Sequence, residues 1–177
     1  MTTERIIITG FMGSGKSTVA RALALLLAAE MIDLDEAIPR EALRSPGEII
    51  ESDGEAAFRE IETRALANVL ASERNEVIAL GGGTWTLPRN RDLIKSKGAL
   101  SVWLDVPFDL CWSRIQSSEG HRPLARTEAS ARALYDHRRE QYRLADLSIS
   151  ADENKTPDQI GAEVFALIKQ ARARRPA

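Results

Sequence analysis

The sequence is poor in the residues that carry thiol and imidazole chemistry. It contains one cysteine, Cys111, and two histidines among 177 residues. A single cysteine excludes an internal disulfide, and so few cysteines and histidines form no cluster with the spacing of a zinc site. Cys111 lies between Leu110 and Trp112, a setting that favours a buried structural thiol over a nucleophile. Because this composition agrees with a reducing compartment, we expect a cytoplasmic protein.

The sequence also lacks an excess of charge of one sign and a long apolar run. Its 24 basic and 26 acidic residues give a net charge of −2, so no general field attracts nucleic acid or an anionic membrane. The basic tail, Arg172, Arg174 and Arg175, is short and is typical of a solvated helix end. The apolar stretch 19–29 is too short to span a bilayer. We expect no nucleic-acid or membrane partner, and we expect a monomer.

What the sequence does contain is a glycine-rich motif near its start. Residues 10–18 read GFMGSGKST and lie between a β-branched run at 6–8 and an apolar helical stretch. In the pattern G-x-x-x-x-G-K-[ST], backbone N–H groups and the start of a helix point at one spot, which suits a polyphosphate. The alternative is a glycine-rich turn that binds nothing, which this context disfavours.

This motif predicts a binding site for a nucleoside triphosphate and Mg²⁺. Lys16 would reach the β- and γ-phosphates, and the Ser17 hydroxyl would ligate the magnesium ion. The contacts to the nucleotide are expected from Gly13, Ser14, Gly15, Lys16, Ser17 and Thr18. The reaction in which the chain uses the nucleotide has to be inferred from other residues.

Short apolar runs alternate with helical patterns along the whole chain. Strands are expected at 5–9, 31–33, 77–80, 99–104 and 147–150. Helices are expected at 19–29, 46–52, 55–72, 88–97, 108–115, 128–144 and 157–172. The alternation predicts one α/β domain spanning residues 1–177, a three-layer sandwich around a central parallel five-stranded sheet. Because right-handed crossovers bring the carboxyl ends of the strands to one edge, we expect ligands to bind there.

Three groups of residues after the predicted strands can carry chemistry. Asp33 and Asp35 share one side of an extended chain, so one can support Mg²⁺ while the other accepts a proton from an attacking hydroxyl. The alternative is that Asp35 caps a helix. Arg59 and Glu62 lie one helical turn apart, which by itself describes an ordinary surface ion pair. The glycines at 81–83 either let a ligand approach the backbone or form a tight turn.

Basic residues in the second half of the chain have two interpretations. Arg122 lies in the polar loop 117–127, where an arginine on a lid would exclude water and bring positive charge to a transferred phosphoryl group. The alternative is an exposed arginine on a loop. Arg138 and Arg139 lie on a predicted helix ahead of Tyr142, and a solvated basic face is their alternative.

Taken together, these motifs resemble those of the shikimate kinase family. The matches run in order from residue 5 to about 154: GFMGSGKST at 10–18, DLD at 33–35, SPGEIIESDGEAAFREIE at 45–62, ALGGG at 79–83, RPL at 122–124 and RREQYRLAD at 138–146. The resemblance implies a P-loop kinase that uses ATP and Mg²⁺ to phosphorylate a ring hydroxyl of shikimate, giving shikimate 3-phosphate for aromatic amino acid biosynthesis. It also implies a lid near 117–127 and an acceptor-binding helical region near 34–62.

The resemblance further implies roles for individual residues. Lys16 and Ser17 would contact phosphate and magnesium, and Asp33 would support the metal site. Asp35 would bind the acceptor hydroxyl and act as its base, and the lid arginine Arg122 would reach the phosphates. The remaining acceptor contacts would come from Arg59, Gly81, Gly82, Gly83 and Arg138. Arg114 and Asn154 lie near positions that the family uses around adenine.

Three positions depart from the family pattern, and one of them is Ala125, which replaces a usual leucine in the lid. Glu140 stands where a proline is usual, which extends the helical character and puts a negative charge near Arg138. Trp85 stands where a smaller aliphatic residue is usual, and it either narrows the acceptor pocket or packs outward. These departures leave two other interpretations open. One is a related kinase for another small hydroxylated acid such as gluconate, and the other is a nucleotide-binding module without catalysis that regulates a partner.

Overall fold

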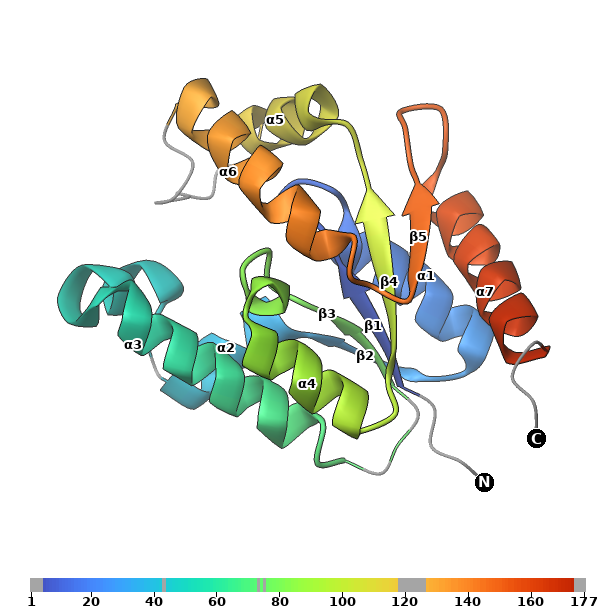
Figure 1. Ribbon diagram of the computed structural model, residues 1–177, viewed down its shortest axis with the longest axis horizontal. Helices are drawn as coiled ribbons and strands as arrows, with labels where there is room; N and C mark the ends of the chain where they lie inside the picture. The colour runs from blue at the N-terminus through green and yellow to red at the C-terminus, as the bar shows by residue number, and fades with distance from the viewer. Residues whose placement is uncertain (1–4, 43, 73, 75, 118–126, 174–177) are drawn as a thin grey trace.

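The protein is built around one parallel sheet (Figure 1). The computed structural model describes residues 5–42, 44–72, 74, 76–117 and 127–173. The sheet contains β1 (Arg5–Thr9), β2 (Glu30–Asp33), β3 (Glu76–Ala79), β4 (Leu100–Asp105) and β5 (Leu147–Ser150). The strands lie in the order β2-β3-β1-β4-β5, and every pairing is parallel. The predicted parallel five-stranded sheet is confirmed.

Helices cover both faces of this sheet. They are α1 (Lys16–Leu27), α2 (Leu34–Ala42), α3 (Pro46–Val69), the short 3-10 helix η1 (Thr84–Thr86), α4 (Pro88–Ser96), α5 (Phe108–Ser117), α6 (Glu128–Tyr142) and α7 (Pro157–Ala173). Helices α1 and α7 lie side by side on one face, and α3, α4 and α6 lie on the other side (Figure 1). The predicted three-layer sandwich is thus observed. No helix in the described part of the chain is long and apolar enough to cross a membrane.

The central strand β1 shows why this sequence forms a parallel sheet. Its residues Ile6, Ile7 and Ile8 are all buried, as expected for a β-branched strand that has helices on both faces. Ile7 lies opposite Ile78 of β3 and Ser101 of β4. Since the strands run in the same direction, their carboxyl ends share one edge, and the loops after β1, β2 and β3 meet there.

The helices differ from the prediction in two places near the site. Helix α1 begins at Lys16, inside the glycine-rich motif, so residues 16–18 form its first turn. The two helices expected at 46–52 and 55–72 form the single element α3, which is kinked at Gly54. Gly54 has φ 87° and ψ 164°, a conformation that is essentially open only to glycine. The kink separates the first two turns of α3 from the long segment that carries Arg59.

The apolar spacing did not predict α2 as a separate helix, although the resemblance implied a helical region near 34–62. It starts directly after β2, and its Leu34 and Ile38 lie one turn apart and are both buried. The Asp33 carboxylate accepts a hydrogen bond from the backbone N–H of Asp35 (3.0 Å), which satisfies a donor in the first turn. The cap of this helix is therefore Asp33, whereas the alternative considered above assigned that role to Asp35.

Candidate active site

The glycine-rich loop joins β1 to α1 and forms the first half of the site. Gly13 and Gly15 have φ angles of 76° and 89°, which other residues rarely adopt. At Gly13 there is also no space, because a Cβ there would lie 2.6 Å from the backbone oxygen of Cys111 on α5. The loop can therefore curl tightly against α5 and turn its N–H groups toward the start of α1. Such an arrangement suits an anionic polyphosphate.

The polar side chains of the motif are held by their neighbours. The Lys16 ammonium donates a hydrogen bond to the Phe11 carbonyl (2.8 Å), which folds it back across the loop. On the other side of the loop, Arg114 of α5 donates a hydrogen bond to the Gly13 carbonyl (3.3 Å). Arg114 thus lies beside the expected nucleotide site, in agreement with the region that the resemblance implied. Asn154, by contrast, is exposed after β5, and the pocket described below does not include it.

Asp33 connects the motif to the rest of the site. One of its carboxylate oxygens accepts a hydrogen bond from the Ser17 hydroxyl, and the other accepts the one from the Asp35 N–H. Hydroxyl and carboxylate oxygens are the ligand types that Mg²⁺ takes, usually one or two from the protein with phosphate and water completing the shell. Among the described residues, no group of three or more His, Cys, Asp or Glu could hold a metal. Ser17 and Asp33 therefore fit a magnesium site, to which a protein usually contributes only one or two ligands.

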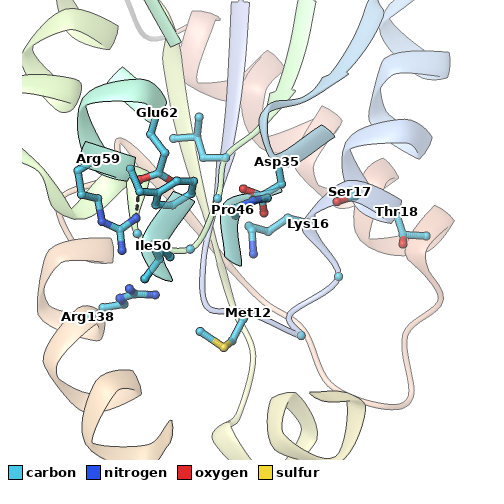
Figure 2. A pocket seen from close by; sticks show the side chains of 17 residues that line it. Met12, Lys16, Ser17, Thr18, Asp35, Pro46, Ile50, Arg59, Glu62 and Arg138 are labelled. Atoms are coloured by element: carbon cyan, nitrogen blue, oxygen red, sulfur yellow. Dashed lines mark hydrogen bonds and ion pairs between the residues drawn. The ribbon is translucent and has the colours of Figure 1, made fainter. Parts of the chain in front are cut away.

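A pocket of about 550 Å³ opens beside the motif. Residues of the glycine-rich loop, the glycines at 81–83, and side chains from α2, α3 and α6 line it. Figure 2 shows Arg59 and Arg138 on one side of this pocket, with Asp35 and Lys16 on the other. The folded chain therefore brings together side chains that are more than 100 positions apart in the sequence.

Arg59 belongs to a buried network and not to a surface ion pair. Its guanidinium donates to Glu62, which is only 1% exposed, and to Glu55 (2.8 Å). The second oxygen of Glu62 accepts a hydrogen bond from the Thr84 hydroxyl (2.8 Å). Burial disfavours the charge of Arg59, but the carboxylates of Glu62 and Glu55 outweigh it and raise the pKa of Arg59. Glu62 thus fixes the orientation of Arg59 toward the pocket.

Arg138 is a buried cation of a different kind. It is 5% exposed, and within the described parts of the chain no carboxylate lies within 4 Å of its guanidinium. Burial lowers the pKa of Arg138, and the positive charge of Arg59 lowers it further. A buried charge without an ion partner is costly. An anion placed between the two arginines would remove this cost.

The neighbours of Arg138 on α6 point elsewhere. Arg139 forms an ion pair with Asp105 at the end of β4 (3.1 Å). Glu140 pairs with Arg143 on the helix surface and not with Arg138. Of the two adjacent arginines that the sequence offered, Arg138 therefore lines the pocket, and the negative charge at Glu140 does not neutralise it.

The three glycines at 81–83 leave space for the side chains of the pocket. None of them has a positive φ, so backbone conformation does not explain them. A Cβ on each would instead meet a side chain from another element: Asp35 at 2.5 Å over the first, Arg138 at 3.3 Å over the second, and the Arg59 guanidinium over the third. The glycines therefore allow one acid and two cations to lie directly on the backbone of this loop.

Several site residues lie outside these contacts or were not anticipated. Arg122 and most of the loop 117–127 are outside the described residues. Trp85 is buried and does not line the pocket, so it neither narrows the pocket nor points outward into solvent. Sequence reasoning did not anticipate the apolar wall of the pocket, which is formed by Met12, Pro46, Ile50 and Phe58. A signal existed for most of this wall, since three of its residues lie in the stretch 45–62.

These features define the class of the protein. A parallel sheet in the order 2-3-1-4-5, a phosphate loop that leads into α1, an oxygen-ligand pair and a cationic pocket at the same edge describe a P-loop kinase that acts on a small molecule. Comparison with known proteins specifies the class further. The model of the shikimate kinase family matches residues 12–169, and the chain belongs to this family.

Relatives support the assignment over nearly the whole chain. The shikimate kinase of Synechococcus elongatus is 40% identical over 166 residues, which cover 92% of this chain and 85% of the relative. The shikimate kinase of a Sulfurihydrogenibium species is 34% identical over 167 residues, covering 94% and 99%. The structure of shikimate kinase from Acinetobacter baumannii in complex with shikimate has a TM-score of 0.89 at 32% identity, covering 96% of this chain and 95% of that chain.

A gluconokinase is also similar, but only in fold. The enzyme from Sinorhizobium meliloti has a TM-score of 0.67 at 21% identity over 96% of this chain and 94% of that chain. The similarity to shikimate kinases is higher in both measures. The comparisons therefore favour shikimate over gluconate as the acceptor.

Proposed function

We propose that this chain transfers the γ-phosphoryl group of ATP to a ring hydroxyl of shikimate, giving shikimate 3-phosphate. Family membership supports the reaction, and the observation that carries the choice of an acidic acceptor is the buried Arg138. This cation has no ion-pair partner among the described residues, and it faces the pocket beside Arg59. Arg59 is already paired with Glu62 and Glu55, so the charge left for an acceptor carboxylate is that of Arg138.

The two arginines would bind the acceptor at its carboxylate end. Guanidinium groups recognise carboxylates through paired, charge-assisted hydrogen bonds. Because Glu62 holds Arg59 and the Arg59 side chain lies across Gly83, this half of the clamp is oriented before the ligand arrives. A ring held at this end can extend along the glycines toward Asp35.

Asp35 and Lys16 would act at the reacting end. The Asp35 carboxylate faces the pocket over Gly81, where it can orient the attacking hydroxyl and accept its proton. Its backbone is held by Asp33, which keeps the carboxylate near the phosphate loop. Lys16 would turn from the Phe11 carbonyl to the β- and γ-phosphates and stabilise the charge there. The resemblance adds Arg122 from the lid.

Ser17 and Asp33 would hold the magnesium ion. A magnesium ion held there would supply positive charge to neutralise the phosphates of ATP. The Ser17 hydroxyl can serve as a ligand, while Asp33 accepts hydrogen bonds from the water molecules around the ion or binds it directly. Removal of divalent cations with EDTA is expected to abolish turnover, and added Mg²⁺ should restore it.

A panel of acceptors tests the proposed function. ADP release, followed in a coupled assay with ATP and Mg²⁺, should rise strongly when shikimate is added and little when gluconate is added. Shikimate methyl ester is a matched probe, because it keeps the hydroxyls but lacks the anion. If the ester is phosphorylated as well as shikimate, Arg138 does not select a carboxylate. If shikimate gives no rise with folded, ATP-binding protein, the proposed reaction is refuted.

A monomeric state stays a prediction from the sequence. Light scattering on the purified protein checks this expectation. The cytoplasmic location stays a prediction from the composition, and cell fractionation is its test.

A further inference from the structure

Trp85 forms part of a contact between the glycine loop and helix α6. It lies in η1, directly after the glycines, and is 3% exposed. Its indole N–H donates a hydrogen bond to the Gln141 carbonyl in the last turn of α6 (2.8 Å). In the opposite direction, the Tyr142 hydroxyl donates to the Gly82 carbonyl (2.5 Å). We call this pair of hydrogen bonds the α6 contact.

The donor side chains of the α6 contact are buried, and both hydrogen bonds are partly buried. Tyr142 is buried like Trp85, and its ring packs near Trp103 of β4. The Gln141 carbonyl lies at the helix end, where carbonyls lack the usual partner one turn ahead. It accepts instead from the Leu144 N–H (3.1 Å) and from Trp85. A partly buried hydrogen bond of this kind holds its partners more firmly than one that is fully exposed to water.

Arg138 depends on this turn of α6 for its position. It precedes Tyr142 by four residues, so the two side chains lie on the same face of the helix. The Tyr142 hydroxyl also favours the charged form of Arg138, which offsets part of the lowering of the Arg138 pKa by burial. With no ion partner among the described residues, Arg138 has little else to fix it over Gly82 until an acceptor binds.

We propose that Trp85 is a positioning residue for the acceptor: together with Tyr142 it holds the last turn of α6 against the glycine loop, and so keeps Arg138 over Gly82. This inference rests on the proposed function, in which Arg138 binds the acceptor carboxylate. It adds a residue that touches neither ATP nor shikimate but sets the distance between the two sides of the clamp.

The loop side of the contact is itself braced. Arg91 of α4 donates hydrogen bonds to the carbonyls of Trp85 and Thr86 (both 2.9 Å). The backbone of η1 is thus tied to α4 while the Trp85 indole reaches α6. Beyond the indole lies a second pocket of about 250 Å³. A smaller aliphatic residue at position 85 would enlarge this pocket and could not donate the hydrogen bond.

The substitution Trp85→Phe tests the role of the indole N–H. It keeps an aromatic ring in the core but removes the donor to Gln141. Loss of one partly buried hydrogen bond should raise KM for shikimate by about 3- to 10-fold, while KM for ATP changes by less than about twofold. Tyr142→Phe should shift the same constant in the same direction. Trp112→Phe is the matched control, because Trp112 of α5 packs on Phe108 away from the α6 contact, and it should leave KM for shikimate unchanged.

Hydrogen exchange without ligands gives a measurement that does not depend on the acceptor. Trp85→Phe should speed the exchange of the amides at 139–144 and leave those of α1 as they are. If KM for shikimate and this exchange are both unchanged, the proposal is wrong. It is also wrong if both Michaelis constants rise together with a large drop in Tm, since that pattern indicates a general packing defect. If the wild-type protein does not phosphorylate shikimate, the proposed function fails, and the exchange result alone decides whether Trp85 holds α6.

Discussion

The two halves of the site are built in different ways. The phosphate loop consists of consecutive residues 10–18, and its binding groups are mainly backbone N–H groups and the start of α1. The acceptor half consists of side chains from α2, α3 and α6 that meet over the glycines at 81–83. The first half depends on local backbone geometry, and the second depends on how distant elements pack.

Their glycines show the same difference. Position 13 requires glycine for two reasons. Its φ is 76°, which other residues rarely adopt, and the backbone of Cys111 leaves no room for a Cβ. Gly83 has no positive φ and makes room only for the end of the Arg59 side chain. Substitutions in the first half should therefore disturb folding and nucleotide binding, whereas those in the second half should act on the acceptor alone.

The largest effect is expected at the point where the two halves meet. Asp35→Asn removes the proposed base, and kcat should fall by about 100- to 10,000-fold, while ATP affinity hardly changes. Glu36→Gln, the adjacent and exposed position on α2, is the control. Coupled ADP release gives the rate, and calorimetry gives the affinity for ATP. A variant that keeps its rate would exclude Asp35 as the base.

Arg138→Ala is expected to separate the two halves by affinity. Because it removes one partner of a buried charge pair in the complex, acceptor binding should weaken by about 2–5 kcal/mol, with little change for ATP. Arg143→Ala removes a surface arginine near the same helix end that pairs with Glu140, and it should be nearly neutral. Titration calorimetry with shikimate and with ATP measures both. Equal losses for the two ligands would point to a folding defect instead.

Two alanine substitutions compare the glycines directly. Gly83→Ala should displace Arg59 and weaken acceptor binding by about 1–3 kcal/mol without a change in Tm, because a flexible side chain can move aside. Gly13→Ala should destabilise the fold by about 1–3 kcal/mol, since neither its φ nor the Cys111 backbone can adapt. Gly47→Ala is the control, as the nearest atom to its Cβ would be 4.0 Å away. If Gly83→Ala lowers Tm as much as Gly13→Ala, the distinction between the two halves is lost.

The smallest effect concerns the support behind the phosphate loop. Burial raises the pKa of the Cys111 thiol from 9.0 to about 11. The folded state disfavours the thiolate. The free energy of unfolding is therefore highest below pH 9 and falls by up to about 2 kcal/mol as the pH rises toward 11. Urea unfolding between pH 8 and about 11 should show this loss in the wild type and not in Cys111→Ala. Identical pH profiles for the two proteins would contradict it.

Most of the fold could be predicted because its signals are local. The β-branched run at 6–8 by itself favours a buried strand. Thr156 and Pro157 mark the start of the last helix, as observed. The apolar spacing did not predict helix α2 because its stretch 34–42 contains Pro39 and few apolar residues. It forms because the Asp33 carboxylate caps it and two of its side chains reach the core. Those contacts exist only once β2 lies in the sheet.

The sequence predicted which residues belong to the site better than it predicted how they are arranged. The resemblance to the family named Asp35, Arg59 and Arg138, and the structure lines one pocket with all three. It did not show that Glu62 is buried, or that Trp85 reaches Gln141. Burial and long-range hydrogen bonds depend on which helices cover which loops, and no spacing along the chain encodes that.

The sequence by itself determined the phosphate loop, the parallel sheet and the family, because glycine conformations, β-branched runs and helix starts act over a few neighbouring residues. Only the tertiary structure decided which charges lie buried and which are balanced. Helical spacing pairs Arg59 with Glu62, but only packing buries that pair and leaves the buried Arg138 without an ion partner among the described residues. The energy of a charge depends on its surroundings in three dimensions, and those surroundings come from parts of the chain far away in sequence.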